Sequence, residues 1–134
     1  MSQDVVVDTN VFVAAGFNSR SASARILKEV ESGNLRMIWD NGTRGEIEHI
    51  LGKIPGLSKA NADRLFRKEA HFSGKTHPER FGHVPDHTDR KFAALADASG
   101  ATLISSDDDL LGSRSKAKVR ILTPVEFCEK ELSR

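Results

Sequence analysis

The stretch "ATLISSDDDLL", Ala101 to Leu111, joins an apolar, β-branched run to two serines and three consecutive aspartates. The apolar half is typical of a buried strand. An amphipathic segment before it, "TDRKFAALADASG" (88–100), predicts a helix, and a weak helical turn at 109–113 leads into a further apolar run, "KVRIL" (118–122). Helical and extended segments therefore alternate on both sides of the three aspartates.

The same alternation extends toward the N-terminus. The sequence predicts strands at 4–8 and 35–39, helices at 21–33, 43–54 and 59–72, a loop at 73–87 and a short final helix opened by Thr123 and Pro124. Strands that alternate with helices form βαβ units around a mostly parallel sheet. We therefore expect an α/β fold, a three-layer α/β/α sandwich around a mostly parallel central sheet.

Length and composition narrow the class of protein. The chain has 134 residues, which predicts a single domain over 1–134, and its 38% hydrophobic and 29% charged residues predict a soluble globular protein. No apolar run approaches the roughly 20 residues that span a bilayer, and the N-terminus lacks a signal-peptide pattern, so we expect a cytoplasmic protein without a membrane partner. The single cysteine, Cys128, excludes an internal disulfide and a thiolate zinc cluster. A net charge of +1 points to no class of partner.

Two aspartates follow predicted strands directly. Asp8 closes "VVVD" and Asp107 closes "TLISSD", so both lie at the carboxyl ends of strands that look central. The carboxyl ends of parallel strands border the crevice in which open α/β sheets bind their ligands. These two carboxylates are therefore expected to converge.

A third aspartate lies on an apolar helix face. Asp89 shares a stripe with Phe92 and Ala93 on the predicted helix. A charge on a buried stripe is costly unless it is paired, hydrogen-bonded or bound to a cation. The alternative is a carboxylate that stabilises the helix dipole or bonds to free backbone N–H groups, with Asp86 or Thr88 as the cap.

A fourth acid comes from the predicted helix at 43–54, but the pattern leaves two candidates. Glu46 and Glu48 lie on opposite flanks of its apolar stripe, so geometry does not decide between them. Thr43 and Glu46 also match the T-x-x-E pattern of a capping box, in which the Glu side chain returns to the backbone of the cap. Both interpretations of Glu46 stay open on spacing alone.

Several carboxylates at close quarters repel one another and persist as anions mainly when a cation neutralises them. Carboxylate oxygens suit Mg²⁺ or Mn²⁺, whereas zinc calls for His or Cys. A bound divalent ion lowers the pKa of a water molecule, orients it and neutralises charge on a phosphoryl oxygen. Phosphodiester hydrolysis is the reaction that uses all three effects.

At this point the residues carry a family resemblance. The segments "VVVDTNVFVAA", "EIEHIL", "DHTDRKFAALADASGA" and "TLISSDDDLL", with the closing "VRILTPVEF", resemble the successive motifs of PIN-domain ribonucleases, in particular the bacterial VapC-like toxins of toxin–antitoxin pairs. Two motifs depart from that branch, which commonly has D-P-D-D where this chain has "DHTD" (86–89) and T-G-D where it has "SSD" (105–107). Both keep the acid that matters.

The resemblance implies an activity and a set of site residues. It assigns Asp8, Glu46, Asp89 and Asp107 as catalytic acids that hold one or two Mg²⁺ or Mn²⁺ ions, Asp86 and Asp109 as outer metal ligands, and Asn10, Ser105 and Ser106 as supporting hydrogen-bonding residues. The implied enzyme is an endoribonuclease in which a metal-activated water attacks the phosphorus and leaves a 5′-phosphate and a 3′-hydroxyl. The resemblance further implies RNA as the substrate, a homodimer, and a small antitoxin protein that inserts into the active site.

Cations near the acids are candidates for RNA binding. Arg90 and Lys91 adjoin the third acid, and Arg114, Lys116 and Lys118 follow the fourth. The alternative for each is an ordinary solvated surface side chain. Aromatic residues are scarce, with no Tyr and one Trp, which favours recognition of RNA by backbone and shape rather than by base stacking.

Some polar residues have a plainer interpretation. Asp109 is either the cap of the helical turn at 109–113 or an outer metal ligand, and Asp108 is expected to be solvated. The loop histidines, His77, His83 and His87, lack cysteine partners and helical i, i+4 spacing, so we interpret them as solvated rather than as a metal cluster.

Other functions are compatible with parts of the pattern. One is an RNA-processing nuclease without an antitoxin, and another is a non-catalytic PIN-like module that binds RNA or protein, against which the presence of all four acids argues. A response-regulator receiver domain needs an acid pair at the first strand. A haloacid-dehalogenase-type phosphatase needs D-x-D there, and this chain has Asp8 followed by Asn10.

Overall fold

The computed structural model describes residues 3–57, 62–114 and 118–132, which fold around a parallel sheet. Its strand order is β2 (Leu35–Met37), β1 (Gln3–Val7), β3 (Thr102–Ile104), β4 (Ile121–Leu122), and every neighbouring pair is parallel. The chain places β2 on one side of β1 and β3 on the other. The winding direction therefore reverses between β1 and β3, which is where open α/β sheets form their functional crevice.

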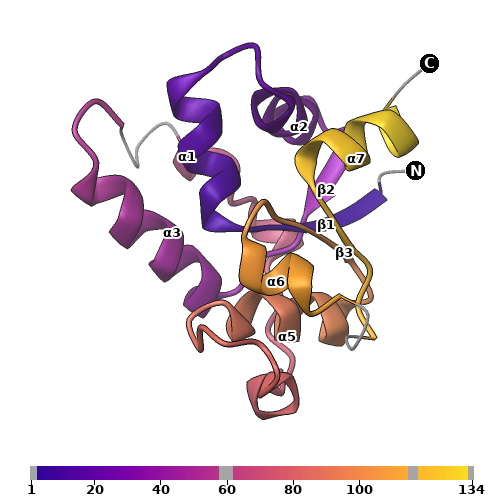
Figure 1. The fold of residues 1–134 in the computed structure, drawn as a ribbon. Coiled ribbons are helices and arrows are strands. Elements are labelled where there is room, and N and C mark those ends of the chain that lie inside the picture. Colours follow the sequence, from indigo (N-terminus) through magenta and orange to yellow (C-terminus); the bar gives the residue numbers. More distant parts are fainter. Residues whose placement is uncertain (1–2, 58–61, 115–117, 133–134) are drawn as a thin grey trace.

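Helices lie on both faces of this sheet. They are α1 (Thr9–Phe17), α2 (Ala22–Glu31), α3 (Asn41–Lys53), α5 (Arg90–Ser99), α6 (Asp108–Gly112) and α7 (Pro124–Phe127), with short 3₁₀ turns η1 (Lys68–Ala70) and η2 (Pro78–Phe81) and a π-helical turn η3 (Cys128–Leu132). Figure 1 shows α1, α2 and α7 above the sheet and α5 below it. The expected α/β fold with a parallel central sheet is confirmed. Among the described residues, no helix has both the length and the apolar character that a membrane span requires.

The second half of β1 and all of β3 and β4 are buried on both faces, which explains their largely apolar sequences. The outer strand β2 alternates instead and exposes Arg36. Val5, Leu103 and Ile104 expose none of their surface. Ile26 of α2 and Phe92 of α5 belong to the same hydrophobic core. This core holds the carboxyl ends of β1 and β3 in fixed positions.

A helix that the sequence pattern does not indicate follows β1 directly. Residues Thr9–Phe17 form α1, and Asp8 is its N-cap residue with an extended backbone. The segment "VFVAAGF" (11–17) is apolar at nearly every position, so it shows no amphipathic period that would predict a helix. Asp8 is consequently placed where a strand turns at once into a helix.

The predicted helix at 59–72 is wrong over most of its length. Residues 59–61 lie outside the described residues, 62–63 are helical, and turns and η1 follow. The chain after η1 bonds to Trp39 instead: the Trp39 N–H donates to the Ala70 carbonyl (3.3 Å), and the Phe72 N–H donates to the Trp39 carbonyl (2.8 Å). The pairing extends the sheet edge beyond β2, and a helix would have used these backbone groups internally.

Candidate metal centre

Asp8 lies at the junction of β1 and α1 and is 3% exposed. Its backbone N–H donates to the Ile104 carbonyl (3.0 Å), which continues the β1–β3 pairing to the strand ends. Burial raises the pKa of the Asp8 carboxyl to about 6, although hydrogen bonds from Ser105 and from the Thr9 backbone lower it, and the Asp107 charge adds to the rise. The surroundings of Asp8 therefore make its ionised form less favourable than it is in water.

Ser105 joins the ends of β1 and β3 through its hydroxyl. The hydroxyl donates to Asp8 Oδ2 (2.5 Å) and accepts the backbone N–H of Asp107 (2.9 Å). Ser105 is fully buried, so water does not compete for either bond. Ser106 is exposed, and its side chain has no hydrogen bond within the described residues. Of the two serines expected to support the site, Ser105 is the one that contacts the acids.

Asp107 is the N-cap residue of α6. Its Oδ1 accepts the backbone N–H groups of Asp109 (2.9 Å) and Leu110 (3.2 Å). The interpretation of Asp109 as the cap of this helix is therefore wrong, because Asp107 already occupies that position. Asp108 is exposed, as expected.

Asp89 stands just before α5 and is 9% exposed. Its side chain makes no capping hydrogen bond, and Oδ2 is buried without a hydrogen-bond partner among the described residues. Burial raises the pKa of Asp89 to about 8, and the charges of Asp107 and Asp8 add to the rise. Asp89 is itself the N-cap residue of α5, so the expectation that Asp86 or Thr88 caps this helix is wrong. The alternative that the Asp89 carboxylate bonds to free backbone N–H groups of the helix is also wrong, because its side chain makes no such bond.

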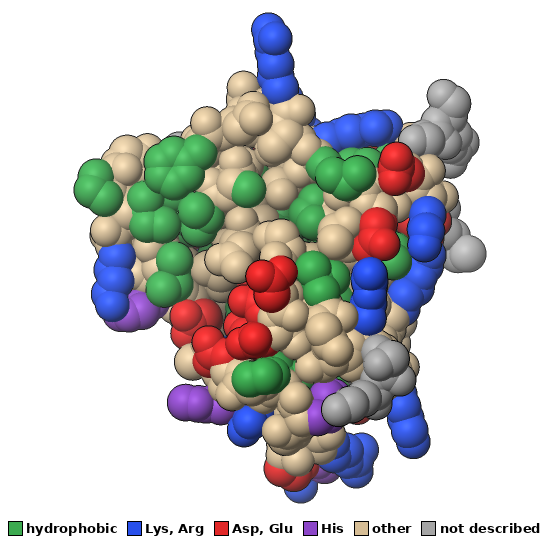
Figure 2. Space-filling model, viewed as in Figure 1, with side chains coloured by type: hydrophobic (Ala, Val, Ile, Leu, Met, Phe, Trp, Pro, Cys, Tyr) green, Lys and Arg blue, Asp and Glu red, His purple; other side chains and the backbone are tan. Residues whose placement is uncertain are grey.

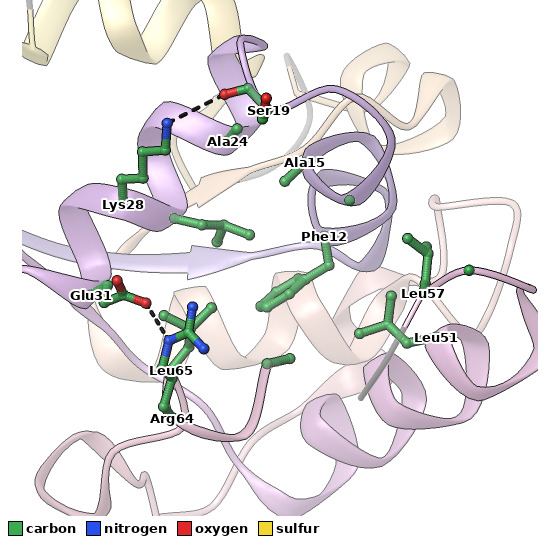
Figure 3. A pocket seen from close by; sticks show the side chains of 14 residues that line it. Phe12, Ala15, Ser19, Ala24, Lys28, Glu31, Leu51, Leu57, Arg64 and Leu65 are labelled. Carbon is green, nitrogen blue, oxygen red and sulfur yellow. Dashed lines mark hydrogen bonds and ion pairs between the residues drawn. The ribbon is translucent and has the colours of Figure 1, made fainter. Parts of the chain in front are cut away.

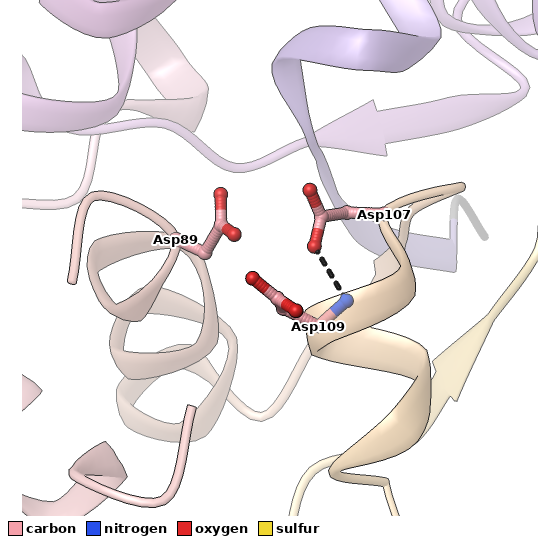
Figure 4. A group of neighbouring side chains, drawn as sticks. All are labelled: Asp89, Asp107 and Asp109. Atoms are coloured by element: carbon pink, nitrogen blue, oxygen red, sulfur yellow. Dashed lines mark hydrogen bonds between the residues drawn. The ribbon is translucent and has the colours of Figure 1, made fainter. Parts of the chain in front are cut away.

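The acids come together at one place. One carboxylate oxygen from each of Asp89, Asp107 and Asp109 lies within 4.8 Å of the others. Figure 4 shows the three side chains converging from the start of α5 and the first turn of α6. In Figure 2, acidic side chains gather around the position that α6 takes in Figure 1. Asp8 lies near this group at the β1–β3 switch point, since its charge adds to the rise in the pKa of Asp89.

The chemistry of this group fits a divalent cation. Its donors are carboxylate oxygens, which suit Mg²⁺ or Mn²⁺. Asp89 Oδ2 is a buried polar atom for which the described part of the chain offers no hydrogen-bond partner, and such atoms are uncommon in native structures. A bound cation would offset the repulsion that raises the pKa values of Asp8 and Asp89.

Glu46, the acid predicted from α3, is not among the residues of this group. The capping box of α3 is formed by Asp40 and Thr43, so the predicted capping box of Thr43 and Glu46 is wrong. Glu46 Oε1 instead lies 3.7 Å from Nζ of Lys91 on α5, and its side chain is 23% exposed. Glu48 forms an ion pair with an arginine one turn earlier in α3. Of the two candidates, Glu46 is the one that contacts the helix beginning beside the aspartates.

Two predicted outer residues contact the acids less directly than expected. Asp86 is exposed, and its Oδ1 accepts the backbone N–H (3.0 Å) and hydroxyl (2.8 Å) of Thr88, which lowers the pKa of Asp86. Asn10 is exposed, and its backbone N–H, rather than its side chain, bonds to Asp8. The sequence pattern does not single out Thr9, which is buried with a hydroxyl that lacks a partner among the described residues. Its place directly after Asp8 is the signal that could have found it.

Most of the predicted RNA-binding cations make contacts within the protein. Arg90 and Arg114 donate to backbone carbonyls, and Lys91 forms the ion pair with the α3 glutamate. Lys118 is exposed and makes no ion pair within the described residues, while Lys116 lies outside them. The two arginines therefore support the fold, whereas Lys118 presents its ammonium group to solvent.

No histidine in the described part of the chain belongs to a group that could hold a metal ion. His77 pairs with Glu79 (3.1 Å) and His87 is exposed. His83 differs from the expected solvated side chain, since it is partly buried and its Nε2 has no hydrogen-bond partner among the described residues.

A separate cavity of about 350 Å³ lies between α1, α2 and the chain that follows α3. Figure 3 shows Phe12, Leu51 and Leu57 at its apolar walls and an ion pair between Glu31 and Arg64 at its rim. None of the four aspartates lines it. The cavity is therefore distinct from the candidate metal centre.

Solved structures share this fold at low sequence identity. A chain in a structure of FitAB bound to the IR36 DNA fragment is 16% identical, with 90% of this chain and 94% of that chain covered and a TM-score of 0.56. A chain in the crystal structure of VapBC2 from Rickettsia felis, bound to a promoter DNA fragment, is 17% identical, with 90% of this chain and 98% of that chain covered and a TM-score of 0.60. PAE2754 from Pyrobaculum aerophilum is 17% identical, with all of this chain and all of that chain covered and a TM-score of 0.57. At these identities the likeness concerns the fold.

A family comparison covers the acids themselves. None of the curated proteins compared with this chain matches it. The PIN domain model matches residues 4–109, a range that includes Asp8, Glu46, Asp89, Asp107 and Asp109. Because the match extends over most of the sequence and the fold agrees with it, the chain belongs to the PIN domain family.

Proposed function

We propose that this chain is a metal-dependent endoribonuclease that hydrolyses RNA phosphodiester bonds with Mg²⁺ or Mn²⁺ held by Asp8, Asp89, Asp107 and Asp109. The observation that carries the proposal is the convergence of the Asp89, Asp107 and Asp109 carboxylates near Asp8, with Asp89 Oδ2 buried and without a hydrogen-bond partner among the described residues. Raised pKa values, about 6 for Asp8 and about 8 for Asp89, are more common at functional sites than at acids that only stabilise a fold. Membership of the PIN domain family supports the same activity.

Each residue has a separate task in this proposal. Asp89 and Asp109 offer carboxylates from two different helices, so the cation would hold α5 and α6 together. Asp107 keeps one oxygen on the α6 N-terminus, which fixes the direction of the other oxygen. Ser105 holds Asp8 at the end of β1. When bound, the cation would lower the pKa of a water molecule and neutralise charge on the phosphoryl oxygens.

Glu46 would complete the acid set from α3. Its ion pair with Lys91 gives it a cationic partner, which the four aspartates lack among the described residues. We assign Glu46 a weaker share in cation binding, because its carboxylate must leave Lys91 to reach a cation. Lys91 would then be free to contact a phosphate of the RNA.

The decisive experiment compares two neighbouring aspartates. Asp107→Asn removes one charge from the metal centre but keeps the α6 cap, since Asn caps helices as well as Asp does. Asp108→Asn removes the same charge from an exposed position one residue away. With Mn²⁺ and a single-stranded RNA, we expect Asp107→Asn to lose about a hundredfold or more in cleavage rate, because loss of even a partner of a metal ligand costs about ten- to a hundredfold. Asp108→Asn should cleave like the wild type.

The proposal fails if highly purified wild-type protein does not cleave RNA with Mn²⁺, or if the Asp107→Asn preparation cleaves equally fast. Equal cleavage would point to a contaminating nuclease. The ends of the RNA products give a further check, since hydrolysis by a metal-activated water leaves a 5′-phosphate.

We also assign this chain an antitoxin partner and a homodimeric state. The resemblance to VapC-like toxins supports both assignments, and the similar chains in the FitAB and VapBC2 structures support the antitoxin partner. A short open reading frame directly upstream, whose product co-purifies with this chain and suppresses RNA cleavage, would support the partner. Active nuclease with no such reading frame would favour RNA processing instead. Light scattering of the purified chain tests the dimer.

A further inference from the structure

Arg90, the first residue of α5, turns its side chain back onto the segment that precedes it. Its Nε donates to the Val84 carbonyl (2.9 Å), and its Nη2 donates to the Gly82 carbonyl (3.2 Å). Both carbonyls belong to residues 82–89, which form neither helix nor strand between η2 and α5. The guanidinium group at the start of α5 therefore binds the far end of this segment and closes it into a loop.

The loop carries Asp89, whose carboxylate has little to hold it. Its side chain does not cap α5, and Oδ2 is buried without a partner among the described residues. A side-chain hydrogen bond joins Asp89 to the Asp107 carboxyl, but it exists only while one of the two groups is protonated, because two ionised carboxylates repel one another. The direction of the ionised Asp89 side chain therefore depends on how its backbone is held.

Most other bonds in this segment are local. The Asp89 N–H donates to the Asp86 carbonyl (3.1 Å), the Arg90 N–H donates to the His87 carbonyl (3.3 Å), and Asp86 Oδ1 accepts the Thr88 N–H (3.0 Å). Bonds within five residues shape a turn but do not connect it to its surroundings. The two bonds from Arg90 reach further, to residues six and eight positions earlier.

Arginine suits this contact for a geometric reason. Its guanidinium group is planar and presents several N–H donors in a fixed fork, so it can reach two carbonyls at once. A lysine ammonium is a flexible point donor and does not reproduce the fork. Val84 is itself buried, so the carbonyl that Arg90 holds is anchored to the core.

We infer that Arg90 is a positioning residue of the metal centre: its fork on the Gly82 and Val84 carbonyls fixes the 82–89 loop and thereby the direction of the Asp89 carboxylate. The inference rests on the proposed metal-dependent function. It replaces the sequence-based hypothesis that Arg90 binds RNA, because two of its donors point into the protein.

The test measures Mn²⁺ binding without RNA by calorimetry at pH 8. The variants are Arg90→Met and Arg90→Lys, and the control is Arg80→Met, which removes an exposed cation from η2 whose side chain makes no hydrogen bond or ion pair within the described residues. We expect both Arg90 variants to bind Mn²⁺ about tenfold more weakly, as loss of a ligand-orienting partner does. Arg80→Met should bind like the wild type.

The sign of the change separates positioning from charge. Removing a positive charge beside the acids would by itself tighten Mn²⁺ binding, so weaker binding by Arg90→Met cannot be a charge effect. Arg90→Lys keeps the charge and loses the fork. Circular dichroism checks that each variant folds. If Arg90→Met does not fold, the Mn²⁺ affinity of Arg90→Lys alone tests the inference.

Unchanged or tighter Mn²⁺ binding by both variants overturns the inference. If KM for RNA rises in Arg90→Met but stays at the wild-type value in Arg90→Lys, Arg90 would instead be assigned to RNA binding. If the wild type itself binds no Mn²⁺, the proposed function fails. Hydrogen exchange of metal-free protein then decides the positioning role: amides of 82–89 should exchange faster in both Arg90 variants than in Arg80→Met, and equal exchange would overturn the role.

Discussion

Ser105 shows how a single side chain prepares the site. It holds Asp8 and the backbone of Asp107 with one buried hydroxyl, so the two strand-end acids keep a fixed separation before any cation binds. A methyl group in its place would leave a carboxylate oxygen and an N–H group buried without partners.

The first prediction compares two adjacent serines. Ser105→Ala should lower the free energy of unfolding by about 2 kcal/mol, because both buried polar groups then lack a partner. Ser106→Ala should change it by less than about 0.5 kcal/mol, since Ser106 is exposed. Urea denaturation measures both. Equal effects of the two substitutions would show that the Ser105 hydroxyl does not carry these bonds.

A second prediction concerns pH. Burial raises the pKa of Asp8 to about 6 and that of Asp89 to about 8. Both values lie above those of the unfolded chain, so the folded, metal-free protein binds more protons between about pH 4 and pH 8. Its free energy of unfolding should therefore fall as pH rises through that window. Mn²⁺ must displace the same protons, so its affinity should rise over the same range.

Calorimetry at several pH values between about 5.5 and 8.5 measures the affinity, and urea denaturation measures the stability. Mn²⁺ affinity that is independent of pH, or metal-free protein that becomes more stable with rising pH, would contradict the assignment of these two carboxyls.

Single residues also show what sequence can and cannot predict. The positions of Asp8 and Asp107 follow from strand ends alone, because a parallel sheet brings such ends to one edge. The grouping of Asp109 with Asp89 could not be predicted, because it depends on which aspartate caps α6. The inward direction of Arg90 was equally hidden, since its partners are backbone carbonyls.

Among the elements, α5 and α6 present the acids, and their ends decide where those acids point. α5 ends at Gly100, whose φ of +75° is a conformation that glycine adopts without strain. Gly45, in contrast, lies inside α3 with nothing within 4 Å of an added Cβ. These two glycines therefore have opposite roles in stability.

The third prediction follows from this difference. Gly100→Ala should lower the free energy of unfolding by about 1 kcal/mol, since alanine is strained in the left-handed region. Gly45→Ala should raise it by about 0.5 to 1 kcal/mol through helix propensity. Thermal denaturation of the two variants gives the signs. A stabilising Gly100→Ala would mean that α5 does not end in this conformation.

Elements with a clear amphipathic period were predictable, and the others were not. α2, α3 and α5 carry such a period and form close to the predicted positions. α1 is too uniformly apolar to show one. Segment 62–72 shows a period but bonds to Trp39, so tertiary contacts overrule its local preference.

At the scale of the whole molecule, the fold gathers carboxylates where repulsion opposes them. Such a site lowers the free energy of unfolding of the metal-free protein, and a bound ligand raises it again. The molecule is therefore expected to be less stable without metal than its core would allow.

A fourth prediction tests whether the buried acids lower stability in the absence of metal. At pH 8.5, metal-free Asp89→Asn should be more stable than the wild type by about 1 to 3 kcal/mol, because it no longer buries an unpartnered charge. Mn²⁺ at a hundred times its dissociation constant should stabilise the wild type by about 2.7 kcal/mol and the variant hardly at all. Denaturant titrations with and without Mn²⁺ measure both quantities. A less stable metal-free variant would show that Asp89 has a structural role instead.

The most direct measurement of the central claim is anomalous diffraction from crystals of the wild-type protein soaked in Mn²⁺ near pH 8. The account predicts a manganese peak bonded to carboxylate oxygens of Asp89, Asp107 and Asp109, with Asp8 beside it, and no such peak in Asp107→Asn crystals. Manganese bound elsewhere, or no manganese among these aspartates at millimolar concentration, would contradict it.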